Sequence, residues 1–229
     1  MKNKSSNIKL SASIMCADLS NLEVECLRLE VAKVDRIHFD IMDGLFVNNI
    51  ELGFSLIRAL REISDLAFEC HLMVLKPERY IDVLLELGIE YICVQIESVK
   101  KLKSISEKIR NGKSKIGIAI NPDTSIDKIK PFLGDIDQVC FMTVLPGFAG
   151  QPFRPDVLRK IKELKNIIRI EKYNVEIETD GNMNKKTIPE VVRSGADVLV
   201  LGSSSLFAIK QNPKKYKTIV NEIRDCIDI

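Results

Sequence analysis

The feature that most constrains this chain is a regular alternation of short apolar runs with longer segments of helical periodicity. The apolar runs, rich in β-branched residues, predict strands at 8–14, 36–42, 67–74, 91–97, 115–121, 138–144, 174–180 and 197–201. The segments between them predict helices at 21–31, 55–63, 77–87, 101–110, 125–132, 157–168, 187–193 and 214–227. Such strict alternation argues for a parallel sheet with right-handed crossovers.

The number of these units predicts the architecture. Eight strand–helix units within 229 residues favour closure into one barrel over an open sheet. The predicted fold is therefore α/β, a single (β/α)8 TIM barrel in which residues 1–229 form one domain. An open doubly wound sheet is the structural alternative, but no G-x-G-x-x-G run follows the first predicted strand.

Charge and cysteine content limit the partners and the compartment. A net charge of +2 is too small to indicate a nucleic-acid partner, and no long apolar run predicts a membrane span. The N-terminus is polar and does not resemble a signal peptide, and the six cysteines form no C-x-x-C pair. We expect a cytoplasmic homo-oligomer with free thiols and a small-molecule substrate.

Polar side chains share one face in four of the predicted strands. Successive strand residues point to opposite sides, so the apolar face packs under the helices and the polar face lines the barrel interior. The polar face carries His38, Asp40 and Met42; Glu69, His71 and Met73; Gln95 and Glu97; and Glu176, Glu178 and Asp180.

Both histidines of the chain, His38 and His71, fall on this interior face. Asp40 and Asp180 lie with them near the C-terminal strand ends, where barrel enzymes place their active sites. Two imidazoles and two carboxylates suit a divalent metal such as Zn²⁺, Mn²⁺ or Fe²⁺. A hydrogen-bonded core histidine is the alternative for each ring taken alone, and the interior glutamates receive no predicted role.

Glycine-bearing loops follow the last three predicted strands. They are residues 144–153 with Gly147 and Gly150, then Gly181 with Asn182, and then 202–205. Barrel enzymes often bind phosphate with the loops after strands seven and eight. Each glycine alone can serve an ordinary turn, but three adjacent loops predict a phosphate site.

Motifs at 38–44, 70–74, 121–124, 142–153, 180–181 and 202–203 resemble the ribulose-phosphate 3-epimerase family, from about Leu10 to Phe207. The resemblance implies a barrel with one divalent metal ion (Zn, Fe, Mn or Co). Its ligands would be His38, Asp40, His71 and Asp180, with Asp40 and Asp180 also serving as acid and base. Substrate contacts would come from Ser13, His71, Gly147, Phe148, Ala149, Gly150, Asp180, Gly181, Asn182, Gly202 and Ser203, with Met42 and Met73 near the reacting centre.

The same resemblance leaves the length of the sugar open. The predicted reaction is epimerisation at carbon 3 of D-ribulose 5-phosphate to D-xylulose 5-phosphate. The alternative is D-allulose 6-phosphate to D-fructose 6-phosphate, because 70–74, 142–153 and 176–181 are similar to the allulose-6-phosphate 3-epimerase branch. Departures from the family pattern occur at Asn48, Glu69, Gln95, Leu145 and Asn182.

The predicted mechanism uses two aspartates because inversion needs proton transfer on opposite sides of carbon 3. The metal would stabilise the enediolate, and the 147–150 loop would close over the substrate. A decarboxylase or synthase barrel is one alternative, but the D-x-K-x-x-D run of such decarboxylases is missing, since Ile41 and Met42 follow Asp40. A non-catalytic metal- and sugar-phosphate-binding barrel is the other.

Overall fold

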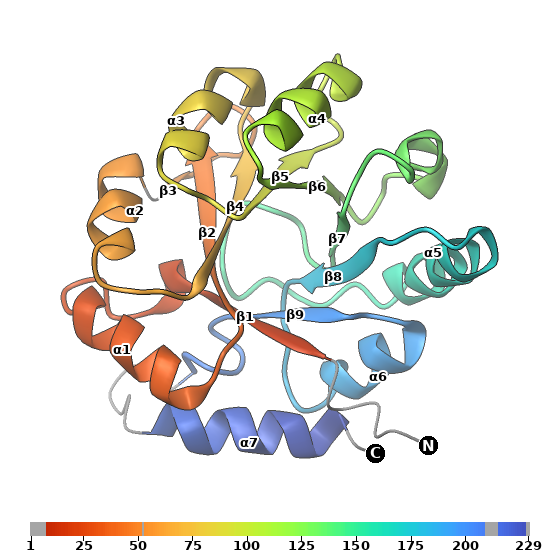
Figure 1. The fold of residues 1–229 in the computed structure, drawn as a ribbon. Helices are drawn as coiled ribbons and strands as arrows, with labels where there is room; N and C mark the ends of the chain where they lie inside the picture. Colours follow the sequence, from red (N-terminus) through yellow and green to blue (C-terminus); the bar gives the residue numbers. More distant parts are fainter. Residues whose placement is uncertain (1–7, 52, 209–214, 228–229) are drawn as a thin grey trace.

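The computed structural model describes residues 8–51, 53–208 and 215–227. Its eight barrel strands are β1 (Lys9–Ser13), β2 (Arg36–Asp43), β4 (Ala67–Met73), β5 (Tyr91–Gln95), β6 (Lys115–Ile120), β7 (Gln138–Met142), β8 (Glu176–Asp180) and β9 (Val198–Leu201). Neighbours pair in parallel, and β1 pairs with both β2 and β9, which closes the ring (Figure 1). The predicted (β/α)8 barrel is therefore confirmed.

Helices surround the ring of strands (Figure 1). They are α1 (Leu22–Ala32), α2 (Phe54–Arg61), α3 (Ile81–Glu86), α4 (Leu102–Asn111), α5 (Val157–Glu171), α6 (Thr187–Ser194) and α7 (Tyr216–Ile227). Short 3-10 turns precede two of them, η2 (Ile14–Cys16) and η3 (Pro77–Arg79). The predicted start of the last helix at 214 lies outside the described residues.

One predicted helix is wrong. Residues 125–132 form two successive 3-10 turns, η4 (Ile126–Lys128) and η5 (Lys130–Phe132), in place of a continuous α-helix. Pro131 has no backbone N–H and its ring crowds the preceding turn, so an α-helix cannot continue through it. Residues 77–87 are likewise divided between η3 and α3.

A two-residue strand, β3 (Ile50–Glu51), was not predicted. It pairs antiparallel with the end of β2, at Met42 and Asp43. The Asp43 carboxylate accepts hydrogen bonds from the backbone N–H groups of Leu45, Phe46 and Leu75. This side chain therefore ties the loop after β2 to the loop after β4, at the C-terminal end of the barrel.

The two faces of the strands divide as predicted. Ile37, Phe39 and Ile41 of β2 belong to the apolar core between strands and helices, while His38 and Asp40 are buried inside the ring. All six cysteines are free. Within the described ranges, no helix is long and apolar enough to cross a membrane.

Charged side chains fill the N-terminal end of the barrel. Arg36, only 2% exposed, donates hydrogen bonds to Gln138 Oε1 at 2.7 Å and to Glu176, and it packs over the Tyr91 ring. Gln138 in turn donates to Glu69 and to Glu178, the latter at 2.7 Å. These groups, hereafter the floor network, join β2, β4, β7 and β8 across the barrel.

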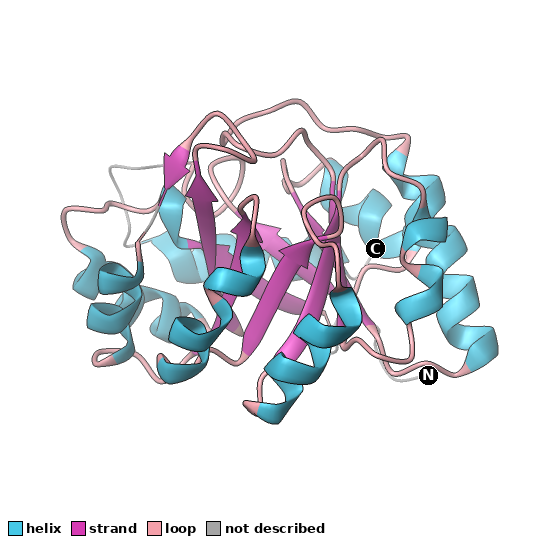
Figure 2. Cartoon of the chain, turned by 90° about the horizontal axis from the view of Figure 1, so that it is seen from above, coloured by secondary structure: helices cyan, strands magenta, loops and turns pink. Residues whose placement is uncertain are grey.

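The barrel strands all run toward the same side, where the longer loops gather (Figure 2). This is the end opposite the floor network, because Arg36, Gln138 and Glu176 are the first residues of their strands. Side chains from the C-terminal halves of β2, β4 and β8 are therefore brought to one place.

Candidate active site

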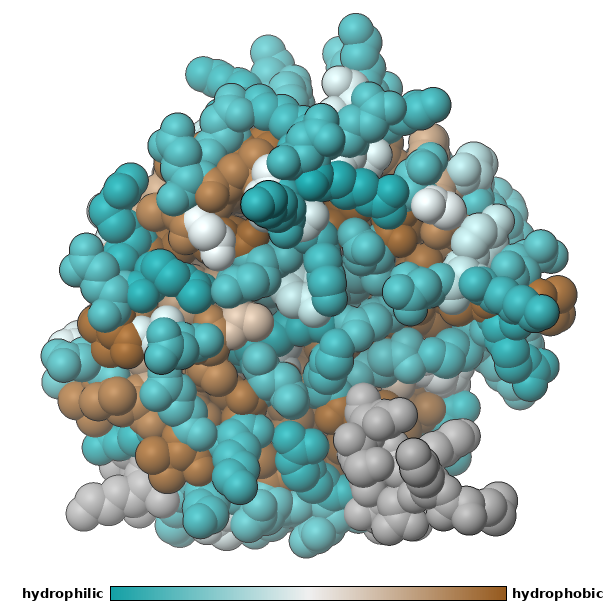
Figure 3. Space-filling view, in the orientation of Figure 1, coloured by the Kyte–Doolittle hydropathy of each residue, from teal (hydrophilic) through white to brown (hydrophobic). Residues whose placement is uncertain are grey.

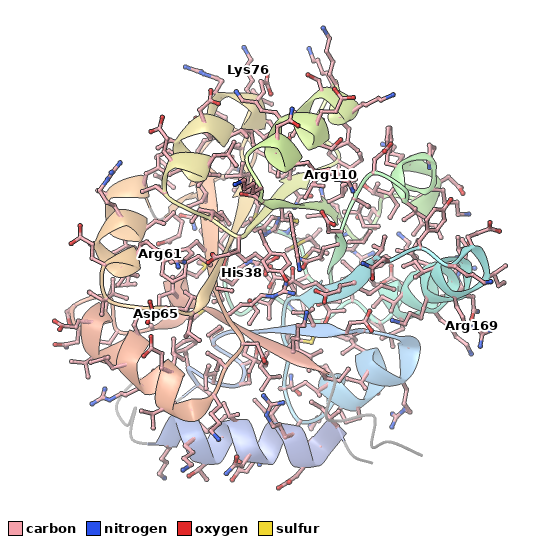
Figure 4. All side chains as sticks on the ribbon, in the orientation of Figure 1. His38, Arg61, Asp65, Lys76, Arg110 and Arg169 are labelled. Atoms are coloured by element: carbon pink, nitrogen blue, oxygen red, sulfur yellow. The ribbon has the colours of Figure 1, made fainter. Side chains whose placement is uncertain are left out.

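Four side chains meet inside the ring at its C-terminal end. His38 and Asp40 come from β2, His71 from β4, and Asp180 is the last residue of β8. One nitrogen or oxygen atom of each lies within 4.8 Å of those of the other three. Figure 4 places His38 within the ring of strands, whereas Lys76 and Arg169 point away from it.

The two histidines turn different ring nitrogens toward the acids. His38 Nε2 lies 3.4 Å from Asp40 Oδ1 and 3.8 Å from Asp180 Oδ2. His71 presents Nδ1 instead, 3.5 Å from Asp40 Oδ1 and 3.7 Å from Asp180 Oδ2. The ring centroids are 5.7 Å apart with an angle of 60° between the planes.

This donor set fits a divalent cation. Among the described residues, neither nitrogen of His38 nor Nδ1 of His71 has a hydrogen-bond partner, although both rings are fully buried. Buried polar atoms without partners are rare in folded proteins and require an explanation. Ligand atoms about 2.1 Å from a tetrahedral ion lie about 3.4 Å from one another, close to the spacing seen here.

The two carboxylates of the cluster differ in protonation. Burial raises the pKa of Asp40, but the charges of the neighbouring His38 and His71 outweigh burial and hold that pKa well below its usual range. Burial and the neighbouring Asp40 charge raise the pKa of Asp180 to about 6, more than the two histidines lower it. Without a bound cation, Asp40 is therefore ionised where Asp180 can still carry a proton.

The two glutamates below the cluster, Glu69 and Glu178, also differ in protonation. Burial raises the pKa of Glu69, but His38 and Arg36 outweigh it and hold the value at about 2. Burial and the Glu69 charge raise the pKa of Glu178 well above its usual range. One ionised and one protonated carboxyl thus share the Gln138 amide beneath the histidines.

Polar neighbours surround the cluster. Ser13 Oγ donates a hydrogen bond to Asp40 Oδ2 at 2.7 Å. The Gln95 amide lies 3.0 Å from His71 Nε2, and Glu69 Oε2 lies 3.6 Å from His38 Nδ1. The side chains that converge on the acids are therefore held from behind as well.

An open cleft lies above the cluster. It is lined by Ser13, Met15, Cys16, Asp40, Met42, Met73, Met142, Val144, Leu145, Pro146, Gly147, Phe148, Ala149, Gly150, Gln151, Asp180, Gly181, Asn182, Val200, Gly202, Ser203 and Ser204. None of these is a lysine or arginine, so backbone N–H groups, hydroxyls and side-chain amides are the donors that this cleft offers to an anion.

Two asparagines fasten the loop after β7, the main wall of the cleft. Asn49 Nδ2 donates to the carbonyl of Gly147, and Asn182 Nδ2 donates to that of Gln151, each at 2.8 Å. Asn184 Nδ2 donates to Asn182 Oδ1, also at 2.8 Å. The loops after β2, β7 and β8 are therefore joined around the opening.

The sequence model described as "Ribulose-phosphate 3 epimerase family" matches residues 9–207. The chain belongs to this family. A Bacillus subtilis ribulose-phosphate 3-epimerase is 39% identical over 198 residues, 86% of this chain and 91% of that protein. One from Methanocaldococcus jannaschii is 38% identical over 218 residues, 95% of this chain and 90% of that protein.

Solved structures outside the epimerase family share the fold. A 3-hexulose-6-phosphate synthase matches with a TM-score of 0.71 at 15% identity, covering 96% of this chain and all of that one (100%). A tryptophan synthase alpha-subunit from Pyrococcus furiosus matches with a TM-score of 0.65 at 13% identity, covering 97% and 96%. At such identities the likeness concerns the barrel alone.

Of the residues that the family resemblance indicated, some line the cleft and others are buried beneath it. Ser13, Met42, Met73 and the predicted residues of the loops after β7, β8 and β9 line the cleft. His38 and His71 are fully buried beneath it and do not line it. The structure thus brings the four predicted metal ligands together, and His71, also predicted to contact substrate, lies below the open space.

Sequence reasoning missed the residues that hold these side chains in place. Asn49, Asp43 and Gln95 received no predicted role, yet they fasten a loop, join two loops and contact His71. Asp43 ends β2 and Asn49 lies in the loop that follows it, where polar residues often organise the chain. That position could have indicated Asp43 and Asn49, but it does not apply to Gln95, the last residue of β5.

Proposed function

We propose that this protein interconverts D-ribulose 5-phosphate and D-xylulose 5-phosphate by moving the proton at carbon 3. The observation that carries the proposal is the pair Asp40 and Asp180, held with the two histidines around one cluster at the mouth of the barrel. Family membership supports it, because the relatives named above carry the name of that reaction. The chain is accordingly an enzyme of the isomerase class.

The chemistry asks for one base and one acid at the same time. The carbon 3 proton is acidic because the neighbouring carbon 2 is a ketone. One of the two aspartates, in its ionised form, accepts the proton from one face, and the other, in its protonated form, delivers a proton to the opposite face. The reverse reaction exchanges the two roles.

A single divalent metal ion, Zn, Fe, Mn or Co, is part of the proposal, with His38, Asp40, His71 and Asp180 as its ligands. When bound, such an ion supplies Lewis acidity that stabilises negative charge developing on the substrate oxygens. Ser13 holds Asp40 by donating to its second oxygen, Oδ2, while Oδ1 faces the histidines. This arrangement fixes the direction from which Asp40 meets the substrate.

The glycine-bearing loops are the proposed phosphate site. Gly147, Gly150 and Gly181 have positive φ angles, and the cleft presents backbone and hydroxyl groups from the loops after β7, β8 and β9. Phosphate held there would orient the sugar, so that carbon 3 lies between the two carboxyl groups. Phe148 and Ala149 would cover the substrate from the outside.

An NMR assay in D₂O tests the reaction directly. The metal-loaded protein is given D-ribulose 5-phosphate and, separately, D-allulose 6-phosphate. A two-carboxyl mechanism predicts deuterium at carbon 3 of the product while the remaining substrate stays largely unlabelled. Faster turnover of the pentose phosphate supports the proposed substrate, and faster turnover of the hexose phosphate would replace it.

Asp40→Asn and Asp180→Asn should each lower kcat by about 10²–10⁴-fold, since each removes one proton-transfer group. Asp35→Asn is the matched control, because Asp35 lies at the opposite end of β2 and accepts a hydrogen bond from the Leu10 N–H. Wild-type activity in both site variants would rule out the proposed acid and base.

We also propose that the protein is a homo-oligomer. Val24, Leu27 and Val31 lie on one side of α1 and are 40%, 47% and 68% exposed. Figure 3 shows apolar side chains gathered over this part of the surface. An exposed apolar patch of this kind is typical of a protein–protein contact. Light scattering of the purified protein measures the mass, and a monomer at micromolar concentration would exclude the proposal.

A cytoplasmic location is proposed as well. Six free cysteines, five of them buried, suit a reducing compartment in which disulfides do not form. Fractionation of the source cells tests this location.

A further inference from the structure

Two buried side chains stand behind the histidines of the site. Glu69 of β4 lies beside His38, with Oε2 3.6 Å from Nδ1, and Gln95 at the end of β5 lies 3.0 Å from His71 Nε2. Both are fully buried and neither lines the cleft. Each therefore faces a histidine ring and not the space open to a substrate.

The orientation of the rings fixes where their protons must be. A histidine nitrogen that binds a cation must be unprotonated, so a neutral ring carries its proton on the other nitrogen. His38 turns Nε2 toward the acids and His71 turns Nδ1 toward them. The protons then belong on His38 Nδ1 and on His71 Nε2, the two atoms that face Glu69 and Gln95.

We propose that Glu69 and Gln95 are positioning residues that hold the two histidines in opposite tautomers. Glu69 accepts the Nδ1–H of His38, and the carbonyl of Gln95 accepts the Nε2–H of His71. The inference rests on the proposed metal site and adds to it, because it says how this chain presents two different ring nitrogens to one cation.

Gln95 is suited to this role because its amide has both a donor and an acceptor. A half-turn of the amide exchanges oxygen and nitrogen at nearly the same positions, which leaves the choice to the hydrogen-bond partner. Oε1 has no partner within the described residues, so turning it to the His71 N–H satisfies both groups.

Glu69 is suited because its carboxylate is itself fixed. Gln138 donates to Oε1, Ser11 Oγ lies 3.5 Å from Oε2, and Arg36 Nη1 lies 3.6 Å from Oε2. The floor network therefore holds the acceptor in place behind His38. His38 is therefore backed by a carboxylate and His71 by an amide.

The chain has only two histidines, which makes the tautomers directly measurable. In ¹⁵N-histidine-labelled protein, long-range ¹H–¹⁵N spectra separate protonated from unprotonated ring nitrogens. With Zn²⁺ bound, we expect one ring protonated at Nδ1 and the other at Nε2. Two rings in the same tautomer would overturn the proposal.

Substitutions of Gln95 and Glu69 test which histidine ring each of them holds. Gln95→Leu should change the His71 signals alone and weaken Zn²⁺ binding, measured by chelator competition, about 10–100-fold. Glu69→Leu should do the same for His38. The conservative changes Gln95→Glu and Glu69→Asp keep an acceptor and should restore the tautomers and most of the affinity.

Cys140→Ala is the matched control, a fully buried interior residue of β7 that should leave both tautomers and Zn²⁺ affinity unchanged. Wild-type tautomers and affinity in both leucine variants would overturn the inference. A Zn²⁺-loaded parent protein with the expected tautomers but no turnover would instead count against the proposed reaction and leave this inference standing.

Discussion

Asp40 and Asp180 have the same side chain and face the same two histidines, yet they hold their protons differently. Asp40 ionises first, because its carboxylate also accepts a hydrogen bond from Ser13. The negative charge of Asp40 then opposes the ionisation of Asp180 and raises the pKa of Asp180. Two like groups at short range cannot both ionise easily in a buried site. A bound cation would relieve this opposition.

The first prediction concerns Asp180 in the metal-free protein. Its pKa rises from 3.8 to about 6 on folding, so the folded state keeps a proton that the unfolded chain loses near pH 4. This stabilisation is complete below pH 4 and is lost as pH rises through about 6, a decrease on the order of 3 kcal/mol. Urea unfolding of metal-free protein between pH 4 and 8 measures it.

The Asp180→Asn variant is the comparison for that measurement. Asparagine cannot ionise, so the part of the pH dependence that belongs to residue 180 should vanish. Equal slopes in the variant and the parent would mean that other buried groups, not Asp180, control the stability in this range.

Gly181 has a backbone conformation and a close neighbour that leave no room for a side chain. Its φ of 121° lies in the left-handed region, and a Cβ there would meet the Val144 side chain at 2.5 Å. Gly181→Ala should therefore disturb the joined loops after β7 and β8 and raise KM at least several-fold. Gly134→Ala, whose Cβ would meet nothing closer than 3.8 Å, is the control for the same substitution. An unchanged KM in Gly181→Ala would contradict this account.

The positions of individual site residues could be predicted from the sequence where strand geometry alone determines them. His38, Asp40, His71 and Asp180 were expected to converge because parallel strands end at the same side of a barrel. It could not tell which ring nitrogen each histidine turns toward the acids, since that depends on side-chain torsions and packing. The contacts of Gln95 escaped prediction for the same reason.

Among the elements, the eight barrel strands were predictable because each is a short, largely buried segment between two stretches of helical periodicity. The failures have local causes. Pro131 breaks the helix expected at 125–132, and β3 has only two residues, too few for a periodic pattern. The connections between loops were not predictable, because they join residues far apart in the chain, such as Asn49 and Gly147.

The loop connections lead to a third prediction. Asn49→Ala removes the hydrogen bond to the Gly147 carbonyl, worth about 0.5–1.5 kcal/mol, so KM should rise about 2–12-fold with little change in kcat. Asn182→Gly should act similarly, since it removes the bond to Gln151 while keeping a residue that tolerates the φ of 54°. Steady-state kinetics of the two variants separate KM from kcat.

The matched control for these variants is Asn111→Ala, at the end of α4 and away from the cleft lining. If Asn49→Ala lowers kcat as strongly as it raises KM, the bond positions the reacting centre and not only the binding loop.

At the scale of the whole molecule, the barrel carries its two polar layers at opposite ends. The floor network joins strands that are distant in sequence, while the cleft occupies the other end. The buried Arg36 and its carboxylate partners, Glu69 and Glu176, stabilise one another. If one partner were removed, the charges left in the interior would be desolvated without compensation. Closure of the ring therefore includes an ionic contribution beside the apolar core.

The fourth prediction tests that contribution. Arg36→Leu leaves Glu69 and Glu176 without their buried partner and should lower the free energy of unfolding by about 3–5 kcal/mol. Lys9→Met, which removes the half-exposed partner of Glu176, should lower it by less than about 1 kcal/mol. Thermal or urea unfolding compares the two, and similar losses would show that the buried position of Arg36 gives it no special weight.

The floor network also affects when a hydrogen taken from the substrate can exchange with solvent. Because packed charges fill one end of the barrel, water and sugar reach Asp40 and Asp180 by the same opening. A seated sugar then keeps solvent from the carboxyl groups, so a hydrogen taken from carbon 3 stays with the enzyme until the product departs. The washout of tritium from labelled substrate should therefore follow product release and not the proton-transfer step.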